Sequence, residues 1–465
     1  MLIDELQSEF TKLQHDIGNG PIYPNVTAPE IRRHLSKYYG FVHPLHLDDV
    51  VADVTEMLRS WDVQITHPRY LGLFNPSVTL ASVAADVLVA MHNPQLASWR
   101  TSPAANEIER HTLAWLAAQF GLPQNTLATF TSGGAEANLS AVIVALTRAF
   151  PSYGENGLRS LNCTPAIYLS SQAHDSFTKI AHMTGMGRKS LRIVATDSLL
   201  KMDIRDLERQ IGEDRKNGFF PLMVVGTCGT TSAGLIDPLA ELGKFCSGAG
   251  LWFHVDAAWG GAAILSPVVR AHLAGIECAD SITCDAHKWF SVPMGCGMFF
   301  CRHPQSAASA FHAQAAYMPS EGGDDTLDPY THSVQWSRRF IGLKLFMSLA
   351  QHGASGYAGM IERQTRMGDL LREALTSSGW RILNSTPLPL VCFTRDGLDI
   401  RSFLASIRER QIAWVSEAEI AGTPVVRACI TSYKTTERDI LWVVDEMNRL
   451  VAGEVPVIAA ATAVH

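Results

Sequence analysis

Short apolar runs alternate with amphipathic segments through the middle of the chain. The runs that predict buried strands are 166–174, 222–227, 251–255 and 281–284. Between them, segments such as 102–118 and the stretch from Ala135 onward carry apolar residues at helical spacing. This alternation predicts an α/β protein with a parallel sheet flanked by helices.

The two ends of the chain show different patterns. Residues 1–84 predict a helical arm, with an N-terminal helix, an extended stretch IYPNVTAPEI and a second helix from Leu47 to Trp61. The arm has too little apolar periodicity to form its own core, so we expect it to pack on another surface, such as a second subunit. A large domain is expected over 85–345, and a smaller α+β C-terminal domain over 346–465.

Composition narrows the classes of function. The 465 residues are 47% hydrophobic and carry a net charge of −7, which argues against nucleic acid or an acidic membrane surface as a partner. The acidic, amphipathic start is unlike a signal peptide, and no apolar stretch is long enough to span a membrane. The nine cysteines are scattered without a CxxC pair, which favours free thiols in a reducing cytoplasm over disulfides or a metal site.

Two predicted strands end in residues that suit a cofactor. Asp256 closes the first and is followed by the small Ala258, while Lys288 lies just after the second. Ligands bind at the carboxyl ends of strands in α/β sheets. Lys288 can attach to pyridoxal phosphate, and Asp256 can hold the pyridine nitrogen protonated so that the ring accepts electrons. The alternative is two buried strands with a solvated lysine at one end.

Other predicted strand and helix ends offer complementary groups. Gly133 and Gly134 precede a helix, where backbone N–H groups and the helix dipole can bind a phosphate, although a plain tight turn has the same pattern. His174 can stack on a flat ring or be an ordinary core histidine. Thr230 and Thr231 can bind a hydroxyl or phosphate, or cap a turn.

Together these motifs resemble the group II pyridoxal-phosphate-dependent amino-acid decarboxylases, which include the aromatic-amino-acid, histidine, glutamate and diaminobutyrate enzymes. The resemblance covers 45–450, and its most specific motifs are HVDAAWGG and DAHKW. SPAANEIE, TSGGAEANL, SSQAHDSFTKIA, GTTSAGLIDP and WSRRFIGLKLF follow in the family's order. The resemblance implies a fold-type I enzyme (aspartate-aminotransferase-like) that is a cytoplasmic homodimer with its active sites at the interface between the two subunits.

The resemblance also implies roles for single residues. The cofactor-binding residues would be Lys288, Asp256, Ala258, His174, Gly134, Ala135, Thr231 and His287. His174 and Ala258 would cover the two faces of the ring, and Gly134 and Ala135 would hold the phosphate. Ala135 replaces a serine or threonine of many relatives, which removes one hydroxyl contact, and Asn106 replaces a threonine of the SPA motif.

The catalytic residues implied by the resemblance are Lys288, Tyr317, His174 and His287. Tyr317 lies in AAYMPSEGGDD, whose glycine pair and polar run predict a closing loop, and it would protonate the substrate carbon. A phenylalanine there implies oxidative deamination to an aldehyde, so Tyr317 favours decarboxylation. The alternative is an ordinary loop aromatic.

The substrate is left open by the sequence. Tyr70, Phe74 and Trp99 predict an apolar pocket and favour an aromatic amino acid. Arg69 or Arg100 could instead receive an acidic side chain such as that of glutamate or aspartate, and 2,4-diaminobutyrate is a further alternative.

Three further arginines admit other interpretations. Arg338 and Arg339 can belong to the cofactor site, to an interface or to a structural ion pair. Arg427 could clamp a substrate carboxylate, as expected of an aminotransferase or lyase of the same fold. A cofactor-binding protein without turnover is the non-enzyme alternative.

Overall fold

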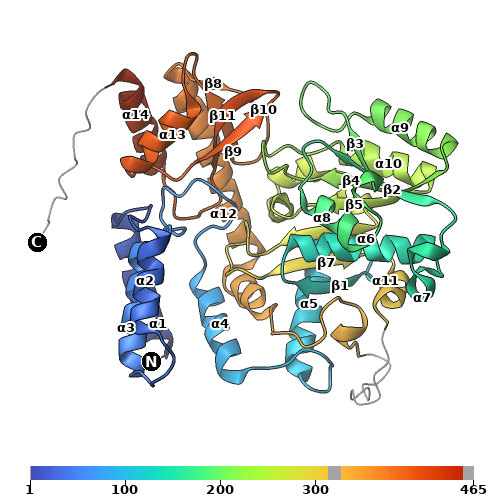
Figure 1. The fold of residues 1–465 in the computed structure, drawn as a ribbon, viewed down its shortest axis with the longest axis horizontal. Helices are drawn as coiled ribbons and strands as arrows, with labels where there is room; N and C mark the ends of the chain where they lie inside the picture. Colours follow the sequence, from blue (N-terminus) through green and yellow to red (C-terminus); the bar gives the residue numbers. More distant parts are fainter. Residues whose placement is uncertain (1, 313–325, 454–465) are drawn as a thin grey trace, which may run out of the picture.

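A seven-stranded sheet forms the centre of the structure, a computed structural model that describes residues 2–312 and 326–453. The spatial order is β1-β7-β6-β5-β4-β2-β3 (Figure 1). The strands are β1 (Leu127–Thr131), β2 (Thr164–Ser170), β3 (Leu191–Val194), β4 (Phe219–Thr227), β5 (Trp252–Asp256), β6 (Ser281–Asp285) and β7 (Gly297–Cys301). Neighbours from β6 to β3 pair in parallel, and β7 runs antiparallel to both β6 and β1. The mainly parallel sheet expected from the sequence is confirmed.

Helices cover both faces of this sheet. One face carries α6 (Gly134–Ala149), α8 (Ser176–Met183) and α11 (Pro304–Phe311), and the other carries α5 (Pro103–Gln119), α9 (Ile204–Lys216) and α10 (Leu239–Ala249). Along β2, Ile167 and Leu169 pack in the core beneath α6, while Ala166 and Tyr168 pack in the opposite core. Burial on both faces explains why these strands read as unbroken apolar runs.

Short helical turns connect the larger elements. They are α7 (Tyr153–Asn156) and the 3₁₀ turns η1 (Leu158–Ser160), η2 (Arg188–Ser190), η3 (Gly260–Leu265), η4 (Val269–Leu273), η5 (Ile276–Cys278) and η6 (Pro329–Thr331). The predicted strand that ends at His174 is shorter in the structure, because β2 ends at Ser170 and the next residues form a loop into α8. His174 therefore lies in that loop.

The C-terminal part has its own sheet and core. The antiparallel strands β8 (Arg381–Ile382), β9 (Leu390–Thr394), β10 (Ser416–Ile420) and β11 (Thr423–Cys429) lie in the order β10-β11-β9-β8. They pack with α13 (Ile400–Glu409), α14 (Glu437–Ala452) and the end of α12 (Leu343–Ser377). Gly353 interrupts α12 with φ 64° and ψ 175°, a conformation that favours glycine.

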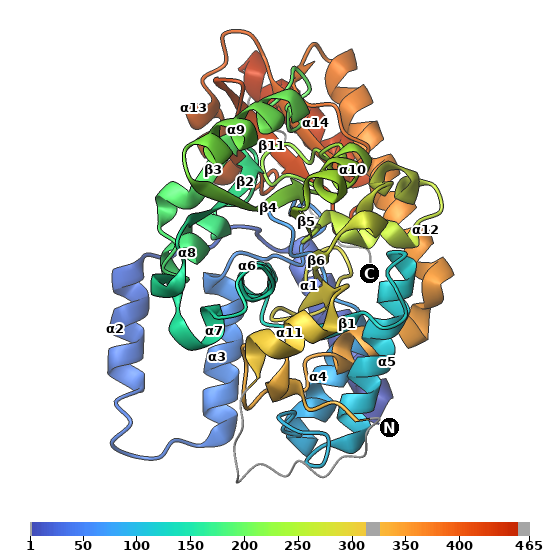
Figure 2. The same cartoon turned by 90° about the vertical axis from the view of Figure 1, so that its right-hand side faces the viewer.

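The N-terminal helices α1 (Leu2–Asn19), α2 (Ala28–Tyr38) and α3 (Leu47–Trp61) stand beside α4 (Leu80–His92), below the C-terminal part (Figure 1). The second half of IYPNVTAPEI, expected to be extended, begins α2 instead. Thr27 and Glu30 form a reciprocal capping box there, and Pro29 occupies the first turn, where its missing N–H costs nothing. Neither α2 nor α3 buries a residue, and both project from one side of the molecule (Figure 2).

The expected domain boundaries fall inside helices. The boundary after residue 84 lies within α4, and that after residue 345 lies within α12. The division into three parts therefore stays a prediction. Among the described residues, no helix combines the length and apolarity needed to cross a membrane.

Candidate functional site

A cavity of about 310 Å³ opens where the carboxyl ends of β4, β5 and β6 meet the start of α6. Its lining residues are Ser132, Gly133, Gly134, Ala135, Glu136, Asn138, His174, Thr227, Gly229, Thr231, Asp256, Ala258, Trp259, Asp285, His287 and Lys288. Every residue predicted to bind a cofactor is in this set. The parallel strands deliver their terminal side chains to one edge of the sheet, which is why residues distant in sequence meet there.

The start of α6 forms one wall of the cavity. The first N–H groups of a helix have no partner within the helix, and the dipole favours an anion at this end. A Cβ on Gly134 would lie 3.0 Å from Asp285 Oδ2 and 3.4 Å from the Ala258 methyl, so a side chain would crowd the wall. Glu136 folds back to accept hydrogen bonds from the Ser132 N–H (2.9 Å) and hydroxyl (2.6 Å), which fixes the loop.

Asp256 ends β5 and is almost fully buried, with 5% of its surface exposed. Its Oδ1 accepts a hydrogen bond from the Ala258 N–H at 3.1 Å, and its Oδ2 accepts one from Asn138 Nδ2 at 2.9 Å. A carboxylate has about four acceptor positions. Two therefore remain for a donor in the cavity, as the predicted contact with a protonated ring nitrogen requires.

Lys288 follows β6 and forms an ion pair with Asp285. The Lys288 Nζ lies 2.9 Å from Asp285 Oδ2, and the lysine side chain, which is 22% exposed, lines the cavity. Asp285 is only 2% exposed. The buried carboxylate thus holds the lysine amine at the cavity wall.

The two predicted histidines are oriented by backbone N–H groups. His287 Nδ1 accepts from the Cys296 N–H at 3.1 Å, and His174 Nδ1 accepts from the Ser176 N–H at 3.1 Å. In the neutral ring of each, the proton is therefore on Nε2. Burial lowers the pKa of His287, which favours the neutral form. Its Nε2 lies 3.7 Å from Asp285 Oδ2.

Three buried polar atoms along the wall have no hydrogen-bond partner among the described residues: Thr227 Oγ1, Trp259 Nε1 and Asp285 Oδ1. Buried polar groups are normally paired, so these atoms can pair with a ligand or with water in the cavity. By contrast, Thr230 Oγ1 accepts from the Leu235 N–H and caps the local turn. Of the two threonines considered, only Thr231 lines the cavity.

These observations fit pyridoxal phosphate. The glycine-opened helix start suits its phosphate, Asp256 suits its ring nitrogen, and Lys288 suits its aldehyde. The unpaired wall atoms supply further polar contacts. The residues present are therefore compatible with the cofactor that the sequence predicted.

The predicted substrate-pocket residues lie in different places. Phe74 stacks on Trp259 with ring centroids 4.5 Å apart, and Lys288 Nζ lies 6.0 Å from the centroid of the Phe74 ring. Tyr70 packs on Trp414 instead, with centroids 5.1 Å apart. Trp99 lines a separate cavity of about 280 Å³ and donates to Glu107 at 3.0 Å. None of these three residues lines the 310 Å³ cavity, although Phe74 lies near it through its contact with Trp259. Tyr317 lies outside the described residues.

Two of the other arginines make structural contacts. Arg338 pairs with Glu109 at 2.7 Å, and both side chains are less than 5% exposed. Arg339 forms an exposed contact with Asp86 at 3.1 Å. Arg69 lies over the Trp442 ring. None of these arginines lines the 310 Å³ cavity.

Arg427 joins three segments behind the cavity. Its Nε donates to the Thr231 carbonyl and its Nη1 to the Gly72 carbonyl, each at 2.8 Å, and Ser416 Oγ lies 3.3 Å away. The guanidinium is beneath the Phe74 ring, 4.8 Å from its centroid. Its Nε and Nη1 hold the backbone at Thr231 and Gly72, whereas its buried Nη2 has no hydrogen-bond partner among the described residues, so a carboxylate-binding role for Arg427 stays a prediction.

Some residues of the site had no assigned role from the sequence. Asp285 closes β6 as Asp256 closes β5, and this repeated position was a usable signal. Asn138 is a polar residue on the apolar face of a predicted helix, among Ala137 and Ala141, which signals a buried contact. Trp259 gave no comparable signal.

The chain is similar in sequence to known pyridoxal-dependent decarboxylases. A family model described as the pyridoxal-dependent decarboxylase conserved domain matches residues 31–395. An aromatic-L-amino-acid decarboxylase from Bacillus atrophaeus is 28% identical over 83% of this chain and 82% of that protein. An L-2,4-diaminobutyrate decarboxylase from Acinetobacter baumannii is 31% identical over 75% of this chain and 71% of that protein.

The fold has solved counterparts. The structure of Catharanthus roseus tryptophan decarboxylase in complex with L-tryptophan superposes with a TM-score of 0.88, covering 97% of each chain at 23% identity. This likeness shows a shared fold.

Proposed function

The chain belongs to the pyridoxal-dependent decarboxylase family and is a pyridoxal-phosphate-dependent amino-acid decarboxylase, and from this premise we propose that its substrate is an aromatic L-amino acid. The reaction removes the α-carboxylate as carbon dioxide and yields the amine. The observation that supports this choice is the Phe74–Trp259 stack beside Lys288. Of the two rings, Trp259 lines the cavity, and an aromatic surface of this kind favours a flat apolar side chain.

The charges of the cavity argue against an acidic substrate. Its charged lining residues are Glu136, Asp256, Asp285 and Lys288. Lys288 is committed to the cofactor in the proposed mechanism, and no arginine is among the described lining residues. Asp256 and Asp285 are likewise committed, to the ring nitrogen and to Lys288, so the described lining offers a glutamate or aspartate side chain no free cation to offset its desolvation, which is costly. An aromatic side chain avoids this cost, while 2,4-diaminobutyrate remains the second candidate because of the relative that is named for it.

The chain's residues divide the work as follows. The bound cofactor supplies an electron sink for the pair left when carbon dioxide departs. Lys288 would hold the cofactor through its side-chain amine, and Asp285 orients that amine from 2.9 Å. Asp256 would keep a proton on the ring nitrogen, and His174 and Ala258 would cover the two faces of the ring. His287 contacts the phosphate or the substrate carboxylate through its Nε2 proton.

A substrate panel tests this proposal. Purified, cofactor-loaded protein is incubated with each common amino acid, L-DOPA and 2,4-diaminobutyrate, and amine, aldehyde and keto acid are measured by mass spectrometry. We expect amine from tryptophan, tyrosine, phenylalanine or L-DOPA and none from glutamate or aspartate. Amine from 2,4-diaminobutyrate alone would select the second candidate, and keto acid without amine would contradict decarboxylation.

The residue that completes the reaction is proposed from resemblance. We assign protonation of the substrate carbon to Tyr317. The Tyr317→Phe variant should form less amine from the substrate found in the panel, and it should release aldehyde and ammonia in the presence of oxygen. Unchanged amine formation would exclude this role for Tyr317.

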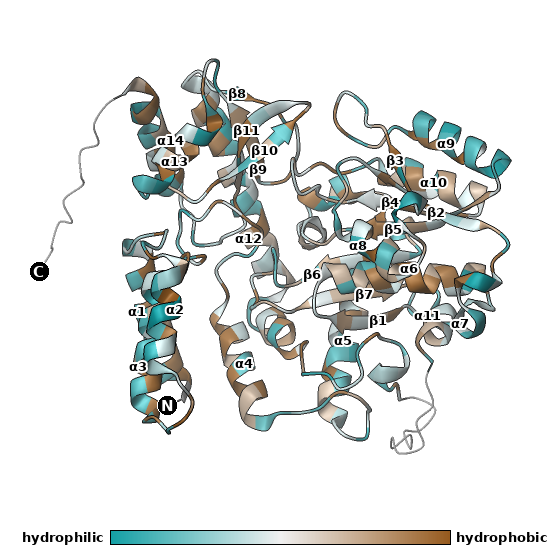
Figure 3. Cartoon of the chain, viewed as in Figure 1, coloured by the Kyte–Doolittle hydropathy of each residue, from teal (hydrophilic) through white to brown (hydrophobic). Residues whose placement is uncertain are grey.

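We also propose a cytoplasmic homodimer. Leu47, Val51, Val54 and Leu58 share one face of α3 and are between 38% and 70% exposed. Figure 3 shows hydrophobic positions along these outer helices as well as in the core. An apolar stripe of this kind is typical of a surface that another chain covers.

Light scattering after gel filtration tests the dimer. The unmodified protein should have the mass of two chains, and the double variant Val51→Asp/Leu58→Asp should have the mass of one. Met183→Asp, at another exposed apolar position, is the control and should stay dimeric. A single-chain mass for the unmodified protein, or a dimeric double variant, would contradict the proposal.

A further inference from the structure

A continuous series of hydrogen bonds runs beneath the sheet from the start of β5 to Asp256. Residues 252, 254 and 256 alternate with their neighbours along β5, so their side chains share one face. That face lies under α6, which brings Asn138 against His254 and Asp256. All of these side chains are buried.

The direction of each hydrogen bond follows from the chemistry of the groups. Trp252 Nε1 can only donate, and it donates to Ser281 Oγ at 2.8 Å. Ser281 Oγ in turn lies 2.8 Å from His254 Nδ1. Asn138 Nδ2 donates to the Asp256 carboxylate, so Asn138 Oδ1, 3.0 Å from His254 Nε2, must accept.

These constraints leave one arrangement of protons. Burial lowers the pKa of His254 to about 4, so its ring is neutral and has one proton. Because Asn138 Oδ1 accepts, that proton is on His254 Nε2, and Nδ1 accepts from the Ser281 hydroxyl. Every donor therefore points toward the cavity, and the series ends on Asp256 Oδ2.

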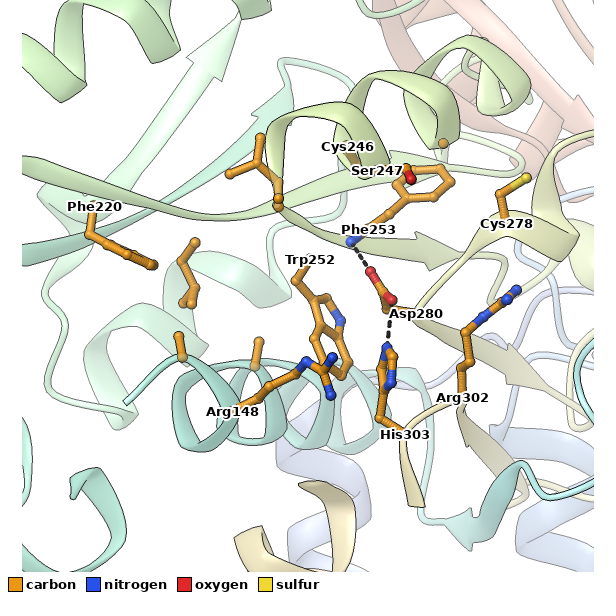
Figure 4. Close-up of a pocket in the computed structure, with 16 residues that line it drawn as sticks. Arg148, Phe220, Cys246, Ser247, Trp252, Phe253, Cys278, Asp280, Arg302 and His303 are labelled. Atoms are coloured by element: carbon orange, nitrogen blue, oxygen red, sulfur yellow. Dashed lines mark hydrogen bonds and ion pairs between the residues drawn. The ribbon is translucent and has the colours of Figure 1, made fainter. Parts of the chain in front are cut away.

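The outer end of the series is fixed by separate contacts. Trp252 lines another cavity, of about 450 Å³, which lies where β4, β5 and β6 begin (Figure 4). There Asp280 accepts from the Phe253 N–H at 2.8 Å and contacts His303 Nε2 at 2.7 Å (Figure 4). Asp280 and Phe253 are the chain neighbours of Ser281 and Trp252. Their hydrogen bond therefore fixes the backbone next to the first pair of the series, Trp252 and Ser281.

We propose that Asn138 and His254 are positioning residues, which hold the Asp256 carboxylate in the orientation that receives the cofactor ring nitrogen. The proposal rests on the role given to Asp256 in the proposed function. Ala258 N–H fixes Oδ1 and Asn138 fixes Oδ2, while His254 prevents the Asn138 amide from turning over. If the amide turned over, its oxygen would face the carboxylate, and two acceptors would oppose each other. A preorganised contact of this kind depends on such supporting groups.

The test compares two replacements of His254. His254→Leu fills the space but cannot hydrogen-bond, whereas His254→Gln keeps one donor and one acceptor. We expect His254→Leu to raise the dissociation constant for pyridoxal phosphate about tenfold or more and to lower kcat about 10- to 100-fold with little change in KM, because small misplacements near the reacting atoms have effects of this size. His254→Gln should recover most of both losses.

Asn138→Leu should weaken cofactor binding at least as much as His254→Leu does, since it removes the direct contact with Asp256. Ser281→Ala is a milder variant in case Asn138→Leu does not fold, and it should give a smaller loss in the same direction. Cofactor binding is measured by fluorescence quenching, and the absorbance spectrum of the lysine-bound cofactor is recorded for each variant. The spectrum should shift in His254→Leu and return in His254→Gln.

Two controls make the result specific. Tyr168→Phe removes another buried hydrogen bond, from Tyr168 on β2 to Asp214 on α9, in the core on the other face of the sheet. It should lower the melting temperature without changing cofactor affinity. Asp256→Ala gives the reference loss for the ring-nitrogen contact. Equal cofactor affinity and spectra in His254→Leu, His254→Gln and the unmodified protein, with Asp256→Ala impaired, would overturn the positioning role alone. An unimpaired Asp256→Ala would overturn the assignment of Asp256 as well.

Discussion

Replacing Lys288 by alanine should reduce amine formation by about three orders of magnitude or more, because the reaction loses its covalent group. No other lysine is among the described residues that line the cavity. The Lys288→Ala protein should still bind pyridoxal phosphate through the α6 start and Asp256, but without the absorbance band of a lysine-bound cofactor. The band and the turnover are measured on the same preparation.

Lys344 offers a matched control. Lys344 is buried, at 5% exposed, and its Nζ donates to the backbone carbonyls of Pro293 and Met294 at 3.3 and 3.0 Å. Lys344→Met should lower stability and keep the absorbance band. A Lys288→Ala protein that keeps the band, or turns over normally, would show that another amine carries the cofactor.

The largest effect on stability is expected at Arg338. This guanidinium faces Glu109 at 2.7 Å with both groups buried, and Glu109 also accepts from the Gly342 N–H. Arg338→Met would leave a buried carboxylate without its counter-charge, which costs about 3–5 kcal/mol of unfolding free energy. The change is measured by urea unfolding of the cofactor-loaded protein.

The neighbouring arginine provides the comparison. Arg339→Met removes an exposed pair with Asp86 and should cost at most about 1 kcal/mol. The double variant Arg338→Met/Glu109→Leu should recover part of the loss, because it removes the unpaired charge. Equal losses of unfolding free energy in Arg338→Met and Arg339→Met would contradict the larger contribution expected of the buried pair.

Local patterns in the sequence were enough to locate the centre of the site. The apolar runs of β5 and β6 are buried on both faces, and the polar residues that end them had to lie at one edge of a parallel sheet. That placed Asp256 and Lys288 without any knowledge of tertiary contacts. The start of α6 was predicted to within one residue, since the apolar spacing predicted a helix from near Ala135 and α6 begins at Gly134.

Contacts that form only where several helices and strands meet could not be predicted from the sequence. His254 appeared as one polar residue within an apolar run, and only the packing of α6 on β5 shows its contact with Asn138. Tyr70 and Trp99 lie in segments whose course over the surface is set by tertiary structure. The strand β10 was not predicted because SEAEI is half exposed and has little apolar signal. The start of α2 was different, since Thr27 and Glu30 form a recognisable local cap.

The contacts of Arg427 bear on when the protein acquires its site during synthesis. Arg427 donates hydrogen bonds to the backbone carbonyls of Thr231 and Gly72, which precede it by 196 and 355 positions. Leu71 likewise bonds to Trp414 and Cys429. A nascent chain that ends before these residues has the large sheet but lacks the groups that hold Thr231 and the Phe74 segment in place. Contacts this distant in sequence form late, so the site reaches its final geometry only after residues 414–429 have been synthesised, and truncations that remove them should impair the site from afar.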